Sequence, residues 1–444
     1  MTPEIRAMMV RGRSLAAGRG ALIRSGFWSL ALRLSGLVSG FLIGVLLARV
    51  LGPTEFGIYG LVTTMAGLGM TVVQLGTPQL AVRELSVRAN RADWIGVGTI
   101  VRQFAFAVAI ASAVIGLLSL VGALALKVSN TELNLVVQCA ILTSLTAFTG
   151  LLAAELRGLG ALLKGQSMDI AVRPLLTFLI VGALLLAGSQ MDALLALTIQ
   201  NAVTLGAVAI SVLWLKQVLP VQPHGAEVAS PIPWVRAALP LGAVDVLRVF
   251  DGSYGVVLVG WISSGADLGV FRVAVACAVL AAMPVTIFHI LLAPTVSRLH
   301  KSPNKEELQK LLSWTAVAMT AIMLLVAVAA WFLGRPLIAL VFGVAYANAW
   351  LPLFLLTLAQ LIYALFGMGP ILLAMCDGER DLIRIYAIAI SAAVALAIPM
   401  TFRWGGAGAA AGPLVSASLI GWMSRRYARR ELGVEITAID ALSS

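Results

Sequence analysis

The sequence has few charged residues and almost no cysteine. Of its 444 residues, 11% are Asp, Glu, Lys or Arg and 60% are hydrophobic, whereas a soluble domain carries roughly 25% charged residues. This composition, with a mean hydropathy of +0.99, excludes a soluble domain and is typical of a protein that crosses a membrane many times. The three cysteines lie far apart in apolar segments, so their spacing predicts neither a disulfide framework nor a metal site.

Apolar runs that are long enough to cross a bilayer as helices recur along the whole chain. They predict an all-α polytopic membrane protein. Its twelve transmembrane helices are expected at about 26–50, 57–81, 95–125, 132–155, 171–189, 192–215, 239–262, 267–293, 311–333, 348–375, 382–401 and 405–423.

The distribution of Lys and Arg predicts how these spans are oriented. The chain has 31 Lys and Arg against 20 Asp and Glu, a net charge of +11. Twenty-three of the cations fall in loops on the side of the two termini, four fall in the opposite loops and four lie within spans. Under the positive-inside rule, both termini are therefore cytoplasmic. The surplus of positive charge is a topology signal, and no nucleic-acid partner is predicted.

An internal repeat divides the spans into two lobes. At a constant offset of 212, residues of the first hairpin recur at the start of the second half: Gly40, Val45, Leu46, Glu55, Gly57 and Tyr59 correspond to Gly252, Val257, Leu258, Asp267, Gly269 and Phe271. Repeats of six spans are related by a pseudo-two-fold axis along the membrane normal. The predicted organisation is a basic cytoplasmic N-terminus (1–25), a six-helix lobe (26–219), a cytoplasmic linker (220–238), a second six-helix lobe (239–424) and a cytoplasmic tail (425–444).

The first two spans are predicted to form a hairpin with a tight turn. Gly52 and Pro53 break the helix, and Arg49, Glu55 and Gly57 complete the turn motif.

The first span also has a small, polar face. Ser29, Arg33, Gly36, Gly40 and Gly44 fall within an arc of about 80° on a helix. Glycines at this spacing let helices pack closely, and that alone would explain the stripe. Arg33 favours a face that lines a wet cavity, because arginine inside a membrane avoids lipid.

Four arginines within spans, Arg33, Arg102, Arg248 and Arg272, are the predicted substrate-binding residues. Arginine binds phosphate oxygens bidentately, whereas lysine offers only a point charge. A lumen that holds Arg33, Arg102 and Arg272 would suit an anionic ligand such as a pyrophosphate-linked lipid. The alternative is that Arg102 and Arg272, which are near span ends, reach the membrane surface.

Asp245, Arg248 and Asp251 lie three residues apart on one face of the seventh span. Arg248 can pair with either acid along the helix. One aspartate is enough for such a pair, so the other is free, and both are candidate sites for a coupling H⁺ or Na⁺. No other cofactor is predicted. The alternative is that both acids only neutralise Arg248. Glu155 and Arg157 are expected to pair with each other at the membrane surface.

The turn motif is part of a longer element that resembles a known family. Leu47-Ala48-Arg49-Val50-Leu51-Gly52-Pro53-Thr54-Glu55-Phe56-Gly57-Ile58-Tyr59 is similar to the opening of oligosaccharide flippases of the polysaccharide transporter family. These belong to the superfamily that also holds multidrug exporters and the peptidoglycan-precursor flippase. Further similar elements are Asp267-Leu268-Gly269-Val270-Phe271 followed by Ala274, Ala293-Pro294-Thr295, and Leu340-Val341-Phe342-Gly343 followed by Tyr346.

The resemblance covers nearly the whole chain and implies a function. It implies a V-shaped pair of six-helix lobes around a cationic cavity. Such a protein turns an undecaprenyl-pyrophosphate-linked oligosaccharide across the bacterial inner membrane, for O-antigen, capsule or exopolysaccharide biosynthesis. The implied partners are this lipid-linked substrate, membrane lipids, and a polysaccharide polymerase and glycosyltransferases of the same pathway.

Two other functions stay open at this point. A cation-coupled multidrug exporter of the same superfamily is disfavoured because intramembrane arginines repel cationic drugs. A polytopic glycosyltransferase or polymerase needs sizeable outer loops with acidic residues. The outer loops here are short and no Asp-x-Asp occurs, so the chain is not expected to be an enzyme.

Overall fold

The structure is a computed structural model that describes residues 3–219, 232–300, 305–375, 378–434 and 436–438. Residues 220–231, which make up most of the predicted linker, and the two ends of the predicted terminal segments lie outside the described residues. All regular secondary structure in the described ranges is helical, which confirms the predicted fold class.

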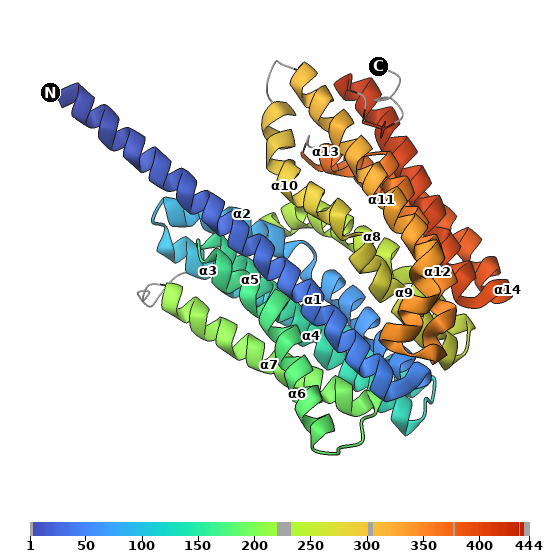
Figure 1. Cartoon of the computed structure of the whole chain (residues 1–444). Coiled ribbons are helices and arrows are strands. Elements are labelled where there is room, and N and C mark those ends of the chain that lie inside the picture. The colour runs from blue at the N-terminus through green and yellow to red at the C-terminus, as the bar shows by residue number, and fades with distance from the viewer. Residues whose placement is uncertain (1–2, 220–231, 301–304, 376–377, 435, 439–444) are drawn as a thin grey trace.

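The chain folds into two helical lobes (Figure 1). Lobe 1 contains α1 (Pro3–Gln74), α2 (Thr77–Asn90), α3 (Trp94–Ala125), α4 (Asn130–Gly158), α5 (Leu162–Gln166), the π-helix η1 (Ser167–Val172), α6 (Arg173–Leu186) and α7 (Ala193–Val218). Lobe 2 contains α8 (Ile232–Ile262), α9 (Gly265–Ala281), α10 (Met283–His300), α11 (Lys305–Phe342), the 3₁₀ helix η2 (Val344–Ala349), α12 (Trp350–Leu365), α13 (Gly369–Met375), α14 (Glu379–Tyr427) and the π-helix η3 (Ala428–Leu432).

Two of the longest helices are broken by glycines with positive φ. In α1 the break is at Gly52 (φ 70°, ψ 174°), and in α14 it is at Gly405 (φ 54°, ψ −132°). An L side chain rarely adopts this backbone conformation, which glycine reaches without a steric penalty. Gly52 therefore ends the first predicted span, with Pro53 opening the second, and Gly405 separates the last two.

By length and hydropathy, eight helices of the described ranges can cross a membrane, or nine if α9 and α10, which meet at a 42° bend, form one broken span. Of these, α1 and α14 each cover two predicted spans, whereas α8, which carries Asp245, Arg248 and Asp251, is not among them. The number of twelve therefore stays a prediction. One predicted boundary is shifted, because the second span ends at Gln74 and not at 81: Leu75 and Gly76 both have positive φ before α2 begins.

Lobe 1 and lobe 2 converge where the second half of α1 packs along α9 and α8 (Figure 1). We call this the closed end of the molecule, and it holds the Gly52 break, the start of α9 and the end of α11. From there the first half of α1 and α10 diverge in the view of Figure 1.

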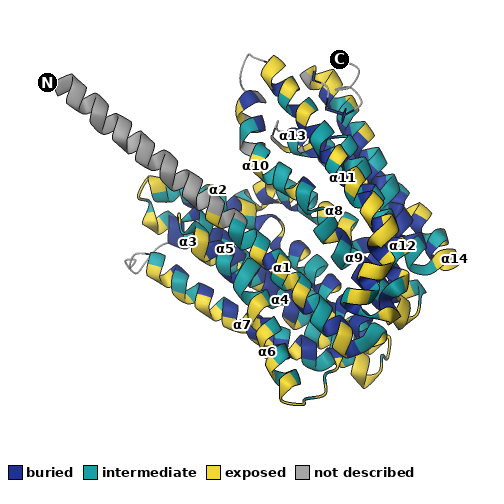
Figure 2. Cartoon of the chain, in the orientation of Figure 1, coloured by how far each residue is buried: buried dark blue, intermediate teal, exposed yellow. Residues whose placement is uncertain are grey.

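Figure 2 marks many residues on the helices of both lobes as exposed, and many of the exposed residues are large and apolar. Leu126, Leu186, Leu340 and Phe106 are among the most exposed of them. Such a surface is unfavourable in water and favourable in hydrocarbon, so it indicates contact with lipid.

Candidate functional site

The two copies of the repeated turn motif meet at the closed end. A Cβ on Gly57 of α1 would lie 2.5 Å from the Gly265 carbonyl oxygen and 2.8 Å from the Gly269 amide nitrogen. A Cβ on Gly269 of α9 would overlap the carbonyl of Pro53. Gly57 and Gly269 are the residues related by the offset of 212. The repeat therefore packs on itself, with a glycine on each side that lets the two backbones touch.

Arg49 and Tyr346 join the lobes beside this contact. The guanidinium of Arg49 donates from Nε to the Val341 carbonyl at 2.7 Å and from Nη2 to the Leu340 carbonyl at 2.5 Å. These carbonyls belong to the last turn of α11, where they have no partner within the helix and where a cation is favoured. The Tyr346 hydroxyl donates to the Ala48 carbonyl at 2.7 Å.

Glu55, unlike Arg49, makes its contact within lobe 1. Its carboxylate accepts a hydrogen bond from the Ala193 amide at 3.1 Å, at the first residue of α7. The Asp192 side chain caps the same helix end by accepting from Leu195 at 2.8 Å. The turn motif thus fixes α1 to α7 in its own lobe and, through Arg49, to α11 in the other.

Arg272 lies in the contact between the lobes. Its Nη1 donates to the Thr64 hydroxyl of α1 at 3.1 Å. Its side chain lies on Gly60, where a Cβ would come within 2.6 Å of Arg272 Cγ and Nε. Tyr59, one residue before Gly60, donates to the side-chain carbonyl of Gln200 on α7.

Arg33 lies in lobe 1 and interacts with a second arginine, Arg157, which the sequence analysis paired with Glu155 and did not place beside Arg33. Arg33 is half-buried, and its Nε is buried without a hydrogen-bond partner among the described residues. Arg157 of α4 interacts electrostatically with Arg33 and with Asp169. The predicted pairing of Arg157 with Glu155 is wrong, because residues two apart on a helix do not face each other. Glu155 is buried, 1% exposed, with one oxygen unpartnered within the described ranges.

A π-helix shapes the surroundings of Arg33 and Arg157. In η1, Asp169 pairs with Arg173 at 3.5 Å, and Ile170 packs directly on Gly36 of α1. A small cavity of about 140 Å³ between α1, α2, α4, α5 and η1 is lined by Gln74, Pro78, Gly150, Ala153, Arg157, Gly165, Gln166, Asp169 and Ile170. π-helical turns occur often at functional sites, but nothing in the local sequence marks this one.

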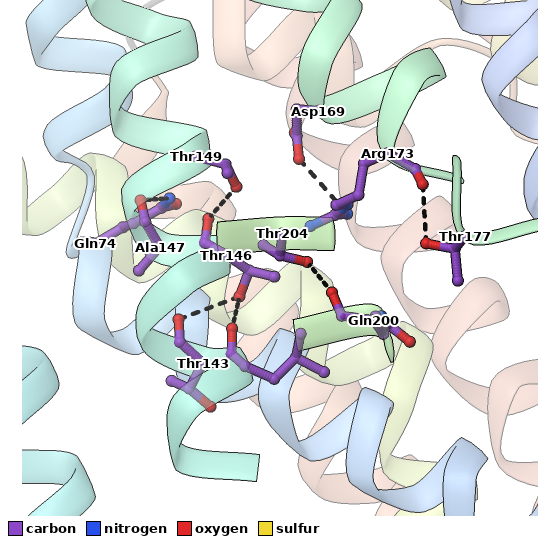
Figure 3. Close-up of polar contacts among 11 residues, drawn as sticks. Gln74, Thr143, Thr146, Ala147, Thr149, Asp169, Arg173, Thr177, Gln200 and Thr204 are labelled. Atoms are coloured by element: carbon purple, nitrogen blue, oxygen red, sulfur yellow. Dashed lines mark hydrogen bonds and ion pairs between the residues drawn. The ribbon is translucent and has the colours of Figure 1, made fainter. Parts of the chain in front are cut away.

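Most other polar groups of this region satisfy one another, as Figure 3 shows. The Gln74 amide donates to the Ala147 carbonyl at 2.9 Å, which ties α1 to α4. The hydroxyls of Thr146, Thr177 and Thr204 donate to carbonyls one turn earlier in their own helices. These threonine hydroxyls are therefore satisfied within their own helices.

Arg102 lies at a different place. It is exposed on α3 and lines an apolar cavity of about 780 Å³ between α1, α3 and the start of α8, together with Phe106, Trp234 and Leu239. Neither Arg33 nor Arg272 lines this cavity.

The charged triplet of α8 divides into a pair and a single acid. Arg248 donates to Asp245 at 2.9 Å, and Gln79 of α2 donates to the same carboxylate from lobe 1. Asp251 has one carboxyl oxygen buried without a partner among the described residues, and the Ser416 hydroxyl of α14 lies beside it. Arg248 and Asp251 both line a cavity of about 740 Å³ in lobe 2. Within the described ranges, no group of three or more His, Cys, Asp or Glu residues could hold a metal ion.

Comparison with known proteins identifies the family. A family model described as "Polysaccharide biosynthesis protein" matches residues 22–300, which is more than half of the chain. The chain belongs to this family. The resemblance seen in the sequence is thereby confirmed. No curated protein sequence matches the chain.

Solved transporter structures share the fold. An inward-facing multidrug resistance MATE family transporter of the MOP superfamily is similar with a TM-score of 0.70 at 12% identity, over 92% of this chain and 98% of that one. The lipid II flippase MurJ in an inward closed conformation has a TM-score of 0.71 at 12% identity, over 95% and 91%. A point mutant of the Vibrio cholerae MATE transporter VcmN has a TM-score of 0.62 at 15% identity, over 93% and 98%. At these identities the likeness concerns the fold alone. It is the two-lobed fold that these MATE transporters and MurJ share.

Proposed function

We propose that this polysaccharide biosynthesis protein is a flippase of the bacterial inner membrane. It translocates an undecaprenyl-pyrophosphate-linked oligosaccharide by alternating access, for the biosynthesis of O-antigen, capsule or exopolysaccharide. Family membership and the two-lobed fold support a transport function. The observation that supports an anionic substrate is the buried Nε of Arg33, which has no hydrogen-bond partner among the described residues, together with the electrostatic repulsion between Arg33 and Arg157 in lobe 1.

Two guanidinium groups that interact in a membrane protein repel each other more than they would in water, because the surrounding dielectric constant is lower. Asp169 offsets part of this charge, but it is also paired with Arg173. The buried Nε of Arg33 still lacks an acceptor among the described residues. A pyrophosphate would supply negative charge and several acceptor oxygens in the geometry that arginine binds best.

The contacts at the closed end support alternating access. Arg49, Tyr346 and the glycine pair Gly57–Gly269 hold the two lobes together there. All of these contacts are between lobes, so the lobes can separate at this end without either one unfolding. Rocking of two repeats around a central site is the usual mechanism in transporters of this construction.

Of the two predicted coupling sites, we propose Asp251 as the one that binds H⁺ or Na⁺. Asp245 already has Arg248 and Gln79 as partners, whereas a buried oxygen of Asp251 has none in the described part of the chain. No further cofactor and no nucleic-acid partner belong to the proposal, and the protein catalyses no covalent reaction. Its partners are the lipid-linked substrate, membrane lipids, and the polymerase and glycosyltransferases of the pathway.

The second candidate function is a cation-coupled multidrug exporter, because solved MATE transporters share the fold. Arg33 and Arg157 argue against this candidate, since their positive charge would repel a cationic drug.

Replacing Arg33 with alanine tests the proposal. In vesicles containing the purified protein, Arg33→Ala should lower the apparent affinity for the lipid-linked oligosaccharide about tenfold or more, because charge-assisted hydrogen bonds are lost. Arg33→Lys should recover only part of it. The matched control is Arg335→Ala, an exposed arginine of α11. Equal affinities of Arg33→Ala and Arg335→Ala would reject the substrate role of Arg33.

Topology offers an independent test. The asymmetry of Lys and Arg predicts that reporter fusions after Arg430 and within 225–230 both report the cytoplasm. A periplasmic signal at only one of these positions would contradict an even number of spans between them, in the second lobe. A periplasmic signal after Arg430 would also contradict the cytoplasmic placement of the C-terminal segment.

A further inference from the structure

Lobe 2 contains a cavity of about 740 Å³. None of the roles assigned above explains a cavity of this size. It lies between α8, α9, α10, α12 and α14. From α9 it receives only apolar side chains, Val275, Ala278 and Val279. The other four helices contribute the polar ones: Arg248, Asp251, Thr286, His289, Gln360, Tyr363, Tyr386 and Ser416.

Several of the polar groups in this cavity have no partner. His289 Nε2 is buried without a hydrogen-bond partner among the described residues, as is one oxygen of Asp251. The amide of Gln360 also makes no hydrogen bond within the described ranges. Buried polar groups are usually satisfied, because leaving one without a partner costs about 1–3 kcal/mol. The unsatisfied buried groups on α8 and α10, with the Gln360 amide of α12 in the same lining, therefore indicate a polar ligand.

Aromatic rings connect these groups into one surface. The His289 and Tyr363 rings are 6.0 Å apart at 65°. Tyr363 and Tyr386 lie near enough to influence each other electrostatically, and Asp251 is near enough to both to do the same. The cavity thus offers donors and acceptors beside aromatic rings on one part of its lining and an aliphatic helix on another.

We propose that this cavity is a carbohydrate site, which holds one or two sugar rings of the substrate's head group. A pyranose has hydroxyl groups that both donate and accept, together with apolar C–H faces. The side chains of Gln360 and His289 can also both donate and accept hydrogen bonds, and the Asp251 carboxylate can accept them. The tyrosine rings and α9 suit the C–H faces. The volume is in the range of small-molecule sites, about 300–1,000 Å³. This inference rests on the proposed flippase function and adds a second anchor to the pyrophosphate site at Arg33 and Arg157.

Other occupants fit the cavity less well. A coupling ion at Asp251 needs only a few oxygen ligands and would fill a small fraction of it. An organic cation would find one carboxylate and aromatic rings, but also the guanidinium of Arg248, which is exposed on the same lining and opposes it. A sugar is neutral and is not repelled. If Asp251 also binds the coupling ion, the two ligands would be neighbours, and each would change the affinity of the other by the same factor.

Binding measurements on the purified full chain test the assignment. The probes are undecaprenyl pyrophosphate without sugar, the same lipid with one N-acetylhexosamine, and the same lipid with a disaccharide. We expect the sugar-bearing probes to bind wild-type protein at least about tenfold more tightly than the sugar-free probe. Gln360→Leu and His289→Phe should each remove about five- to tenfold of this difference, the effect of one hydrogen bond. Neither should change the affinity for the sugar-free probe.

The control variant is Gln217→Leu, the same chemical change at an exposed position of α7. If Gln360→Leu does not fold, Gln360→Met and Tyr363→Phe keep the test decisive, because they alter the shape less. Equal binding of all three probes to the wild type would overturn the carbohydrate site while leaving the flippase proposal intact. Failure of the sugar-free probe to bind at all would instead count against the flippase proposal. Ethidium that competes with the sugar-bearing probes for the wild type, but not for Asp251→Asn, would reassign the cavity to organic cations.

Discussion

Replacing Gly57 with valine is expected to reduce transport at least about 100-fold while leaving the protein folded. A Cβ at this position would lie 2.5 Å from the Gly265 carbonyl oxygen and 2.8 Å from the Gly269 amide nitrogen. Both neighbours are backbone atoms, which cannot rotate away as the end of a side chain can. Overpacking of a close contact costs about 1–3 kcal/mol or more, and valine adds two methyl groups to the Cβ. The closed end would therefore be forced apart.

The effect falls on transport and not on folding because the contact is between lobes. An apolar cluster at the closed end is shared by both lobes, but each lobe also has apolar clusters of its own, around Leu156 in lobe 1 and Met319 in lobe 2. The free energy of unfolding of the separate lobes should therefore change little. About 3 kcal/mol against closure shifts the balance of open and closed ends by roughly 150-fold. A transporter that cannot close one end cannot complete its cycle.

The matched control is Gly67→Val on the same helix, where a Cβ would have nothing within 4 Å. Transport of the lipid-linked oligosaccharide into vesicles should be near wild type in this variant. Labelling of a cysteine introduced at exposed Val50, near the closed end, should increase in Gly57→Val and not in Gly67→Val. Equal transport by the two variants would refute the closed-end role of Gly57.

The sequence was sufficient where local chemistry decides the structure. Gly52 followed by Pro53 breaks a helix in any surroundings, and α1 does break there. By contrast, the break at Leu75 and Gly76 was not predicted. Leu75 has φ 45°, and a Cβ on Gly76 would overlap Ala238 of lobe 2. The reason for this break lies in the other lobe, which is far away in the sequence.

The positions of the arginines show the same limit. A helical wheel places Arg33 on a small polar face but cannot say what faces it. In the structure Arg33 interacts electrostatically with Arg157 of α4, and η1, whose Asp169 also interacts with Arg157, packs on Gly36 of α1. The partner of Arg272 could not be predicted from local spacing either, because Thr64 is 208 residues away in the sequence. Which face is polar can be read from spacing; which polar groups meet depends on tertiary packing.

The acids of α8 illustrate how packing divides a sequence pattern. Three-residue spacing puts Asp245, Arg248 and Asp251 on one face, so either acid could have paired with the arginine. Gln79 of lobe 1 settles the choice by donating to Asp245, which already accepts from Arg248. Asp251 is left with a buried oxygen that has no partner in the described part of the chain.

This division leads to opposite expectations for two similar variants. Asp251→Asn is expected to abolish the response of transport to a Na⁺ or pH gradient, whereas Asp245→Asn should keep it. An unpaired carboxylate in a low-dielectric interior favours binding of a proton or a metal cation, and asparagine cannot take up either in the same way. A carboxylate held by an arginine and an amide already has its compensating charge. Asp245→Asn should instead lower the amount of folded protein, because it weakens the Arg248 pair and the contact with Gln79.

Transport per folded molecule in vesicles, with Na⁺ and pH gradients imposed separately, distinguishes these outcomes. A cation can favour one arrangement of the lobes only if it binds that arrangement more tightly, so a real coupling site must make the rate depend on the gradient. The Asp251 site is placed for this, since it lies between α8 and α14 and so would change if these helices shift. A gradient response in Asp251→Asn equal to that of the wild type would exclude Asp251 as the coupling site. The acid would then serve only to balance the charge of Arg248 across the cavity.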